Sequence, residues 1–194
     1  MQNGFYSRLD ERRGSRQGAS LGDIRTIGPI ASRTTSGYKN LMKITGSCHC
    51  GGIEYEADID PAEVLVCHCT DCQALSGTAF RVVAFAPEHS FKLKKGRPKV
   101  YIKTTSDSGN PREQTFCPDC GAPLYSRSPA RPIATAPPPA GEQAPKLGLR
   151  VGTIRERAQL KPRAQYYHRS ALPWAADLFD LPRIAGSAVS QPKK

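Results

Sequence analysis

The sequence predicts a mainly-β domain built around bound metal ions, and three observations indicate this class. First, all seven cysteines of the 194-residue chain lie between Cys48 and Cys120, in three tight clusters. Second, the apolar residues form short runs, several of them with the alternating pattern of half-buried strands. Third, 17 Gly and 17 Pro favour many turns over long helices. Hydrophobic residues make up 38% of the chain, which is enough for one modest core.

The expected elements follow one another at short intervals. Residues 79–85 (AFRVVAF) are the best strand of the sequence, and residues 53–57 (IEYEA) alternate apolar and polar side chains. Residues 91–94 and 100–103 flank a turn at Gly96-Arg97-Pro98, so we expect them to form a hairpin. Further short strands are expected at 64–66, 115–116, 122–125, 149–154 and 164–168, and one or two helical turns at 173–179.

Composition divides the chain into one domain and two tails. Residues 1–41 are rich in Ser, Gly, Arg and Thr, so we expect a disordered, flexible basic extension there. Residues 42–182 form the expected zinc-binding domain, and residues 183–194 a tail. Within the domain, residues 128–146 (SPARPIATAPPPAGEQAPK) are too rich in proline for a helix or a central strand, so we expect a surface loop.

The net charge of +11 is concentrated outside the predicted domain. Residues 1–41 carry seven Lys or Arg against three Asp or Glu, and the last four residues add two lysines. Residues 42–190 hold nineteen basic against fourteen acidic residues. Since charge runs in tails are commonly just solvated segments, nucleic acid is not among the expected partners.

No apolar run approaches the roughly 20 residues that a membrane-spanning helix requires. The N-terminal stretch also lacks the apolar core of a secretory signal. We therefore expect a cytoplasmic location and no membrane partner. Without export, an odd number of cysteines indicates metal-binding or catalytic thiols rather than a disulfide framework.

The cysteines form three groups: Cys48-x-Cys50, Cys67-x-Cys69-x-x-Cys72, and Cys117-x-x-Cys120. Such spacings place two sulfurs on one side of a tight turn, within reach of one tetrahedral ion. In the third group Pro118 and Gly121 complete the pattern of a zinc knuckle. Seven ligands divide into four and three. Four would close a structural site, whereas three would leave one position of a tetrahedral ion open.

The spacing leaves other arrangements open. One cysteine of the triplet could complete a mixed site and leave other thiols free. The Cys-x-x-Cys pairs also match the thioredoxin-type redox motif, but that motif requires a parallel βαβ context, which this chain lacks. His49 and His68 each stand between two cysteines and are further candidate ligands, although a side chain between ligands at i and i+2 usually points elsewhere.

Several motifs follow one another in a specific order: GSCHCGG at 46–52, CHCTDCQ at 67–73, SG at 76–77, KVY at 99–101, SGN at 108–110 and FCPDCG at 116–121. Looser matches follow in LKPR at 160–163 and LPW at 172–174. In these motifs the chain resembles the glutathione-dependent formaldehyde-activating enzyme and centromere protein V family, over about residues 42–180. Residues 1–41 and the Pro-rich loop fall outside the usual pattern.

The resemblance implies a β-tent fold, in which antiparallel sheets lean together around zinc knuckles, and it implies two zinc ions per chain. It also implies which cysteines bind each ion. The structural zinc would be held by Cys48, Cys50, Cys117 and Cys120, and the zinc of the reaction by Cys67, Cys69 and Cys72.

Three thiolates leave a divalent zinc with a formal charge of −1, which disfavours water activation and suits a further soft thiolate. The resemblance supplies glutathione as that thiol, with its ionised sulfur attacking formaldehyde to give S-hydroxymethylglutathione. The expected function is therefore that of a carbon–sulfur lyase of the S-(hydroxymethyl)glutathione synthase type, active in formaldehyde detoxification. Its expected catalytic residues are Cys67, Cys69 and Cys72.

Glutathione carries two carboxylates, so basic side chains should lie near the open zinc position. The basic residues in segments that could flank it are Arg81, Lys103 and Arg112. The hydroxyl groups near the triplet belong to Thr70, Ser76 and Thr78, to which we assign no catalytic role.

Two other functions stay open at this point. The first is a non-catalytic zinc module that binds a partner or nucleic acid, as the centromere protein V name suggests. The second is a related enzyme that acts on another thiol or aldehyde, because one scaffold can carry many substrate specificities.

Overall fold

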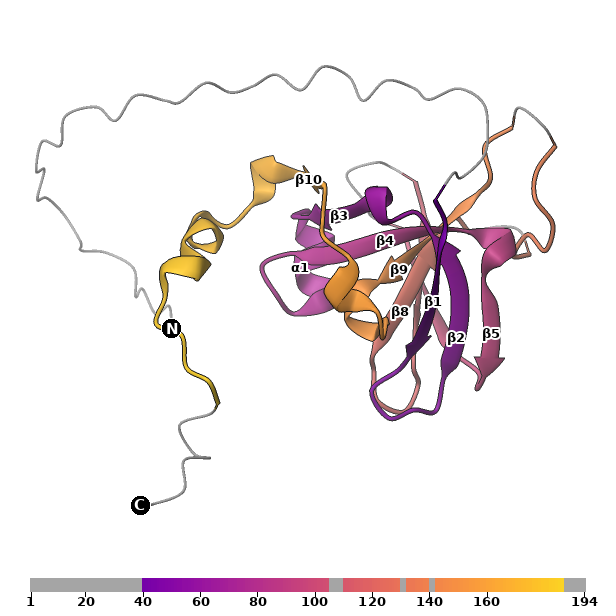
Figure 1. Cartoon of the computed structure of the whole chain (residues 1–194), viewed down its shortest axis with the longest axis horizontal. Helices are drawn as coiled ribbons and strands as arrows, with labels where there is room; N and C mark the ends of the chain where they lie inside the picture. The colour runs from indigo at the N-terminus through magenta and orange to yellow at the C-terminus, as the bar shows by residue number, and fades with distance from the viewer. Residues whose placement is uncertain (1–39, 105–109, 130–131, 140–141, 187–194) are drawn as a thin grey trace, which may run out of the picture. The chain divides into compact units, whose positions relative to one another are not determined.

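The computed structural model describes residues 40–104, 110–129, 132–139 and 142–186, whose strands form two sheets (Figure 1). The smaller sheet has the order β1 (Met42–Ser47), β2 (Glu54–Ile59) and β5 (Lys92–Lys95). The larger sheet has the order β10 (Ala164–Tyr166), β3 (Val64–Cys67), β4 (Arg81–Pro87), β9 (Lys146–Arg150), β8 (Pro123–Arg127), β7 (Arg112–Phe116) and β6 (Lys99–Lys103). Apart from the parallel pair of β10 and β3, neighbouring strands run antiparallel. The mainly-β class with antiparallel sheets is thus confirmed.

The predicted tails fall mostly outside the described residues. This holds for the flexible extension predicted at 1–41, apart from residues 40 and 41, and for the part of the predicted tail beyond residue 186. The described residues of the Pro-rich stretch before Lys146 contain no helix or strand. The domain boundaries at 42 and 182 stay predictions.

The helices are short and lie between strands. α1 (Thr70–Ser76) is capped by Cys69, whose sulfur accepts a hydrogen bond from the backbone N–H of Cys72. The sequence did not predict α1, because seven residues are too few for a recognisable helical period. None of the described helices is long and apolar enough to cross a membrane. The 3-10 helices are η1 (Pro61–Glu63), η2 (Glu88–Ser90), η3 (Val151–Thr153), η4 (Arg157–Gln159), η5 (His168–Ser170) and η6 (Pro173–Asp180).

The main hydrophobic core is formed by residues of both sheets. The smaller sheet contributes Ile44, Tyr55 and Ile59, and the larger sheet contributes Leu124 and Leu149. Each of these side chains is at most 2% exposed. Burying a side chain of this size stabilises the fold by roughly 1.5–3 kcal/mol relative to leaving it in water, so this apolar layer holds the sheets together.

β4 shows that the larger sheet uses both of its faces. Ala84 and Ala86 belong to the main core, whereas Arg81, Val83 and Phe85 line a cavity. Successive side chains of a strand point to opposite faces. The core therefore occupies one face of the larger sheet, and the cavity lies over the other.

The prediction that residues 91–94 and 100–103 form a hairpin is wrong. β5 pairs with β2 of the smaller sheet, whereas β6 pairs with β7 of the larger sheet. The chain changes sheets at Gly96, whose φ of +83° is in the left-handed region that favours glycine. A Cβ at this position would lie 2.3 Å from the carbonyl oxygen of Gly52. The predicted turn exists, but it joins two sheets instead of pairing two strands.

Most predicted strands have different ends in the structure, and the strand expected at 79–85, for example, is β4 (Arg81–Pro87). The strand expected at 149–154 is β9, which starts at Lys146 and ends at Arg150, after which η3 follows. Hydrogen bonds within this turn, from Thr153 Oγ1 to the Arg150 carbonyl at 2.8 Å and from Ile154 N to Val151 O at 3.0 Å, end the strand. β10 is shorter than the strand expected at 164–168, and η6 matches the helical turns expected at 173–179.

We predict that Gly46→Ala strongly destabilises the fold, because a Cβ at this position would lie 2.1 Å from Cζ of Tyr55. The Tyr55 side chain is 2% exposed and its hydroxyl shares a 2.8 Å hydrogen bond with Thr153, so the ring has no room to move aside. We expect the free energy of unfolding to fall by at least about 2 kcal/mol, in the upper range for overpacking. Urea unfolding followed by circular dichroism measures this loss.

Gly152→Ala is the matched control, since no atom lies within 4 Å of the Cβ that it would add. Its free energy of unfolding should stay within about 0.5 kcal/mol of the unsubstituted protein. Equal effects of the two substitutions would contradict the packing of Tyr55 against Gly46.

Candidate functional site

Four cysteine sulfurs gather from two loops that are far apart in the sequence. Cys48 and Cys50 follow β1, and Cys117 and Cys120 lie between β7 and β8. Cys50 Sγ lies 3.4 Å from Cys48 Sγ and 3.8 Å from Cys117 Sγ, and all four sulfurs lie within 4.8 Å of one another. A tetrahedral zinc with Zn–S bonds of about 2.3 Å holds its sulfurs about 3.8 Å apart. This group could therefore hold a metal ion.

Backbone N–H groups stabilise the sulfurs of these two loops. Ile53 N–H donates to Cys48 Sγ at 3.2 Å. The backbone N–H of Ala122 is the main cause that lowers the pKa of Cys120 to about 6. Gly121, with a φ of +69°, takes the left-handed conformation that the second loop needs to close. These donors favour the thiolate, which is the form that binds a metal.

Cys67, Cys69 and Cys72 form a second group within one short segment. Cys67 ends β3, Cys69 caps α1, and Cys72 lies in the first turn of that helix. Cys67 Sγ lies 3.5 Å from Cys69 Sγ, and the three sulfurs lie within 4.8 Å of one another. No histidine or carboxylate of the described residues joins this group. A tetrahedral ion held here would keep one position open.

The three thiols of the second group influence one another's ionisation. A hydrogen bond with Cys72 lowers the pKa of Cys67, and the same bond, together with burial, raises the pKa of Cys72. Burial also raises the pKa of Cys69. These three sulfurs therefore need a cation to become thiolates together. A soft divalent ion such as zinc fits this donor set.

Neither histidine of the cysteine motifs joins a metal-binding group. His68 Nε2 shares a 2.8 Å hydrogen bond with Gln165 Oε1, and His68 is 4% exposed. His49 is exposed to solvent. Neither histidine is a member of the two cysteine groups, as expected for a residue between ligands at i and i+2.

The hydroxyl groups near the triplet make local contacts. The Ser76 hydroxyl donates to the carbonyl oxygen of Cys72 at 2.7 Å, and the Thr78 hydroxyl donates to that of Phe80. Ser76 and Thr78 line a second cavity, and Thr70 lines neither cavity. The hydroxyls of Ser76 and Thr78 thus form hydrogen bonds within α1 and the turn that follows it.

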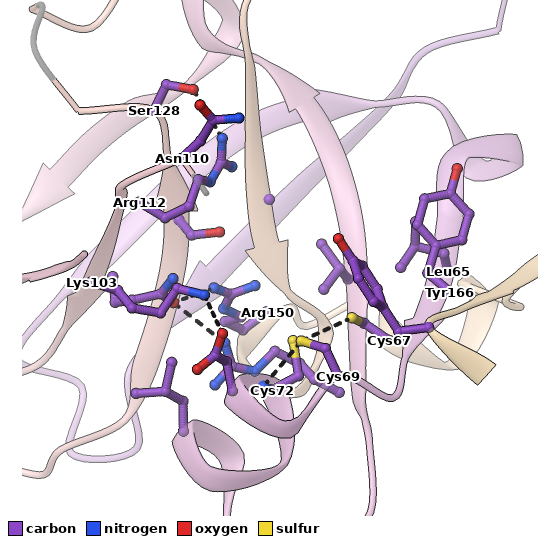
Figure 2. Close-up of a pocket in the computed structure, with 18 of the residues that line it drawn as sticks. Leu65, Cys67, Cys69, Cys72, Lys103, Asn110, Arg112, Ser128, Arg150 and Tyr166 are labelled. Atoms are coloured by element: carbon purple, nitrogen blue, oxygen red, sulfur yellow. Dashed lines mark hydrogen bonds and ion pairs between the residues drawn. The ribbon is translucent and has the colours of Figure 1, made fainter. Parts of the chain in front are cut away.

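The three-cysteine group lies in the wall of a cavity of about 600 Å³. Figure 2 shows the three sulfurs close together, with the Arg150 side chain near them in this view and Lys103 farther away. The apolar part of the lining includes Leu65 and Phe85. Pockets of this size, largely apolar with a few convergent polar groups, are typical of small-molecule sites.

The basic residues that the sequence singled out, Arg81, Lys103 and Arg112, all line this cavity. Lys103 Nζ lies 2.5 Å from Asp71 Oδ2, so this cation is already paired. Arg112 donates to Ser128 Oγ at 3.0 Å. Burial lowers the pKa of both arginines. The cavity therefore combines a thiol-rich wall with positive charge.

Sequence reasoning missed other residues of this lining, among them Arg150 and Asp71. Arg150 reaches the cavity because β9 pairs with β4, where it lies opposite Val83, and no local pattern signals a pairing across so long a loop. Burial, followed by the charge of Arg81, lowers the pKa of Arg150 to about 9. For Asp71 the sequence did contain a signal, because this residue lies between Cys69 and Cys72. A carboxylate inside a ligand motif can anchor a neighbouring cation.

The match to a protein family agrees with this site. The family description "glutathione-dependent formaldehyde-activating enzyme" matches residues 43–170, a range that contains both cysteine groups. A crystal structure of a Rhodobacter sphaeroides protein is 18% identical in sequence, with a TM-score of 0.43, and the match covers 62% of this chain and 98% of that one. Because the family match spans more than half of the sequence, the chain belongs to the glutathione-dependent formaldehyde-activating enzyme family.

Proposed function

We propose that this protein is a zinc-dependent carbon–sulfur lyase that forms or cleaves S-hydroxymethylglutathione. The observation that carries the proposal is the three-cysteine group in the wall of a cavity, with no further histidine or carboxylate ligand among the described residues. Cys67, Cys69 and Cys72 would hold the zinc of the reaction. The zinc of the four-cysteine group, Cys48, Cys50, Cys117 and Cys120, would serve stability.

Zinc bound by the triplet would supply a soft acceptor for the sulfur of the substrate and keep that sulfur ionised at neutral pH. In the overall reaction a carbon–sulfur bond forms between the glutathione sulfur and the formaldehyde carbon. The thiol proton ends on the oxygen of the new hydroxymethyl group, and cleavage is the reverse. The chain's part is to hold the tripeptide with its thiol at the triplet.

Several described side chains fit this positioning role. Lys103, which is 8% exposed, is fixed beside the triplet by its ion pair with Asp71. Leu65 and Phe85 give the cavity an apolar wall, which limits the water around the reacting thiol. Arg112 is oriented by its hydrogen bond to Ser128 and adds a positive charge at another part of the cavity lining.

The four-cysteine group supports a structural role through its position in the chain. It joins the loop after β1, in the smaller sheet, to the loop between β7 and β8, in the larger sheet. Cys117 is 0% exposed and Cys48 is 2% exposed, and both belong to the main core. A metal held there would link the two sheets, and its binding free energy would contribute to folding.

We predict that glutathione binds to zinc-loaded protein through its free thiol. In a calorimetric titration, with zinc content assayed beforehand, glutathione should bind at least about tenfold more tightly than S-methylglutathione, a difference of about 1.4 kcal/mol. S-methylglutathione is the matched control because it keeps both carboxylates and blocks only the sulfur. Equal affinities on fully loaded protein would contradict a thiol at the metal.

We also predict that losing one cysteine has different consequences in the two groups. Cys69→Ser should remove about one zinc per chain and the glutathione-dependent activity, while the circular dichroism spectrum and the melting temperature change little. Cys117→Ser should lower the melting temperature or unfold the protein, since structural zinc contributes on the order of 10 kcal/mol to folding.

The matching measurements are zinc content, circular dichroism melting, and the rate of S-hydroxymethylglutathione formation above the uncatalysed rate. Full activity in folded Cys69→Ser protein would sink the proposed mechanism. A Cys117→Ser variant as stable as the unsubstituted protein would remove the structural role from the four-cysteine group.

A further inference from the structure

Two buried arginines lie beside the three-cysteine group. Arg81 begins β4 and Arg150 ends β9, and these strands are antiparallel neighbours. Arg81 is 6% exposed and Arg150 is 7% exposed, and both line the cavity that contains the triplet as well as the second cavity. Figure 2 shows the Arg150 side chain between Lys103 and the cysteine sulfurs. Two cations are thus taken out of water at one wall of the site.

Among the described residues, the two guanidinium groups share one side-chain acceptor, and several of their donors have no partner. Gln114 Oε1 accepts a hydrogen bond from Arg81 Nη1 at 3.4 Å and from Arg150 Nη2 at 2.8 Å. Arg81 Nε, Arg81 Nη2 and Arg150 Nε are buried and have no hydrogen-bond partner among the described residues. Buried polar groups are nearly always paired in folded proteins, so these donors call for an acceptor that the described residues do not supply.

Charge indicates the same kind of ligand. No carboxylate of the described residues forms an ion pair with either arginine, and the nearby Asp71 is taken by Lys103. The charges that act on Arg81 are those of the three cysteines. Three thiolates and a divalent ion would sum to −1, whereas Arg81, Arg150 and Arg112, which lines the same cavity, sum to +3, so the site would carry an excess of positive charge. A buried excess of this sign is costly without an anion.

We propose that Arg81 and Arg150, aligned by Gln114, form a carboxylate-binding subsite beside the three-cysteine group. A planar guanidinium presents paired N–H donors that match the two oxygens of a carboxylate, which a sulfur atom cannot accept in the same way. The substrate is then a thiol that carries a carboxylate, and neutral thiols are poor ligands. This inference rests on the proposed function, because it takes the thiol of the ligand to be the group that reacts at the metal.

The test compares 3-mercaptopropionate with its neutral analogue 3-mercaptopropionamide on zinc-loaded full-length protein. Each ligand is titrated by calorimetry into the unsubstituted protein, Arg150→Gln, Arg81→Gln and the control Arg155→Gln. Arg155 is exposed and does not line this cavity. The two cavity variants should fold, because each removes a buried cation that has no carboxylate partner in the described part of the chain. Circular dichroism and zinc content verify this for every protein before titration.

Arg150→Gln and Arg81→Gln should each lower the affinity of the protein for 3-mercaptopropionate by about 10- to 100-fold, as expected for losing hydrogen bonds to a charged group. The affinity for 3-mercaptopropionamide should stay the same, and Arg155→Gln should change neither. The affinity of each ligand for a variant is compared with its affinity for the unsubstituted protein. The different acidities of the two thiols therefore do not affect the comparison. Equal losses for acid and amide, or no loss for the acid, would overturn the subsite.

The methyl thioether 3-(methylthio)propionate separates this subsite from the proposed function. If the thiols bind no better than their S-methyl forms, the thiol at the metal is wrong. The subsite is then judged by whether Arg150→Gln weakens the binding of the thioether acid to the protein. If the unsubstituted protein binds neither the thiol acid nor the thioether acid, the carboxylate subsite is overturned.

Discussion

The alternation of side chains along β4 is the constraint on which the rest of the structure depends. One face of this strand supplies Ala84 and Ala86 to the apolar core. The other face supplies Arg81, Val83 and Phe85 to the cavity that contains the three-cysteine group. A shift of register by one residue would exchange the faces and place an arginine in the core. The strong apolar burial on one side therefore fixes the position of the charged residue on the other.

The two cysteine groups differ in what they connect, and this difference supports different roles. The four sulfurs come from loops of both sheets, so an ion among them would link parts of the fold that are about seventy residues apart in sequence. The three sulfurs come from one short segment, from the last residue of β3 to the first turn of α1, where the fold does not need a metal to close a long loop. Their surroundings are instead a cavity, an ion pair and two buried arginines.

Parts of this arrangement could be predicted and parts could not, for identifiable reasons. The strand at 79–85 has a run of β-branched and aromatic residues, and it became β4. The hairpin at 91–103 failed because a turn signal at Gly96 marks a change of direction and carries no information about which strand pairs with which. Helix α1 was missed because its seven residues offer no period, although Gly77 marks its end. Arg150 was missed because only the pairing of β9 with β4 brings it to the site.

The sequence by itself determined the mainly-β class, the family and the cysteines that could bind metal, because these features are written in local spacing and in short alternating runs. The tertiary structure decided how the cysteines divide into two groups of sulfurs within 4.8 Å, and which basic residues face the triplet. Those facts depend on contacts between strands that are far apart in the chain. Such contacts follow from the burial of apolar faces in one packed core, which no short segment specifies alone.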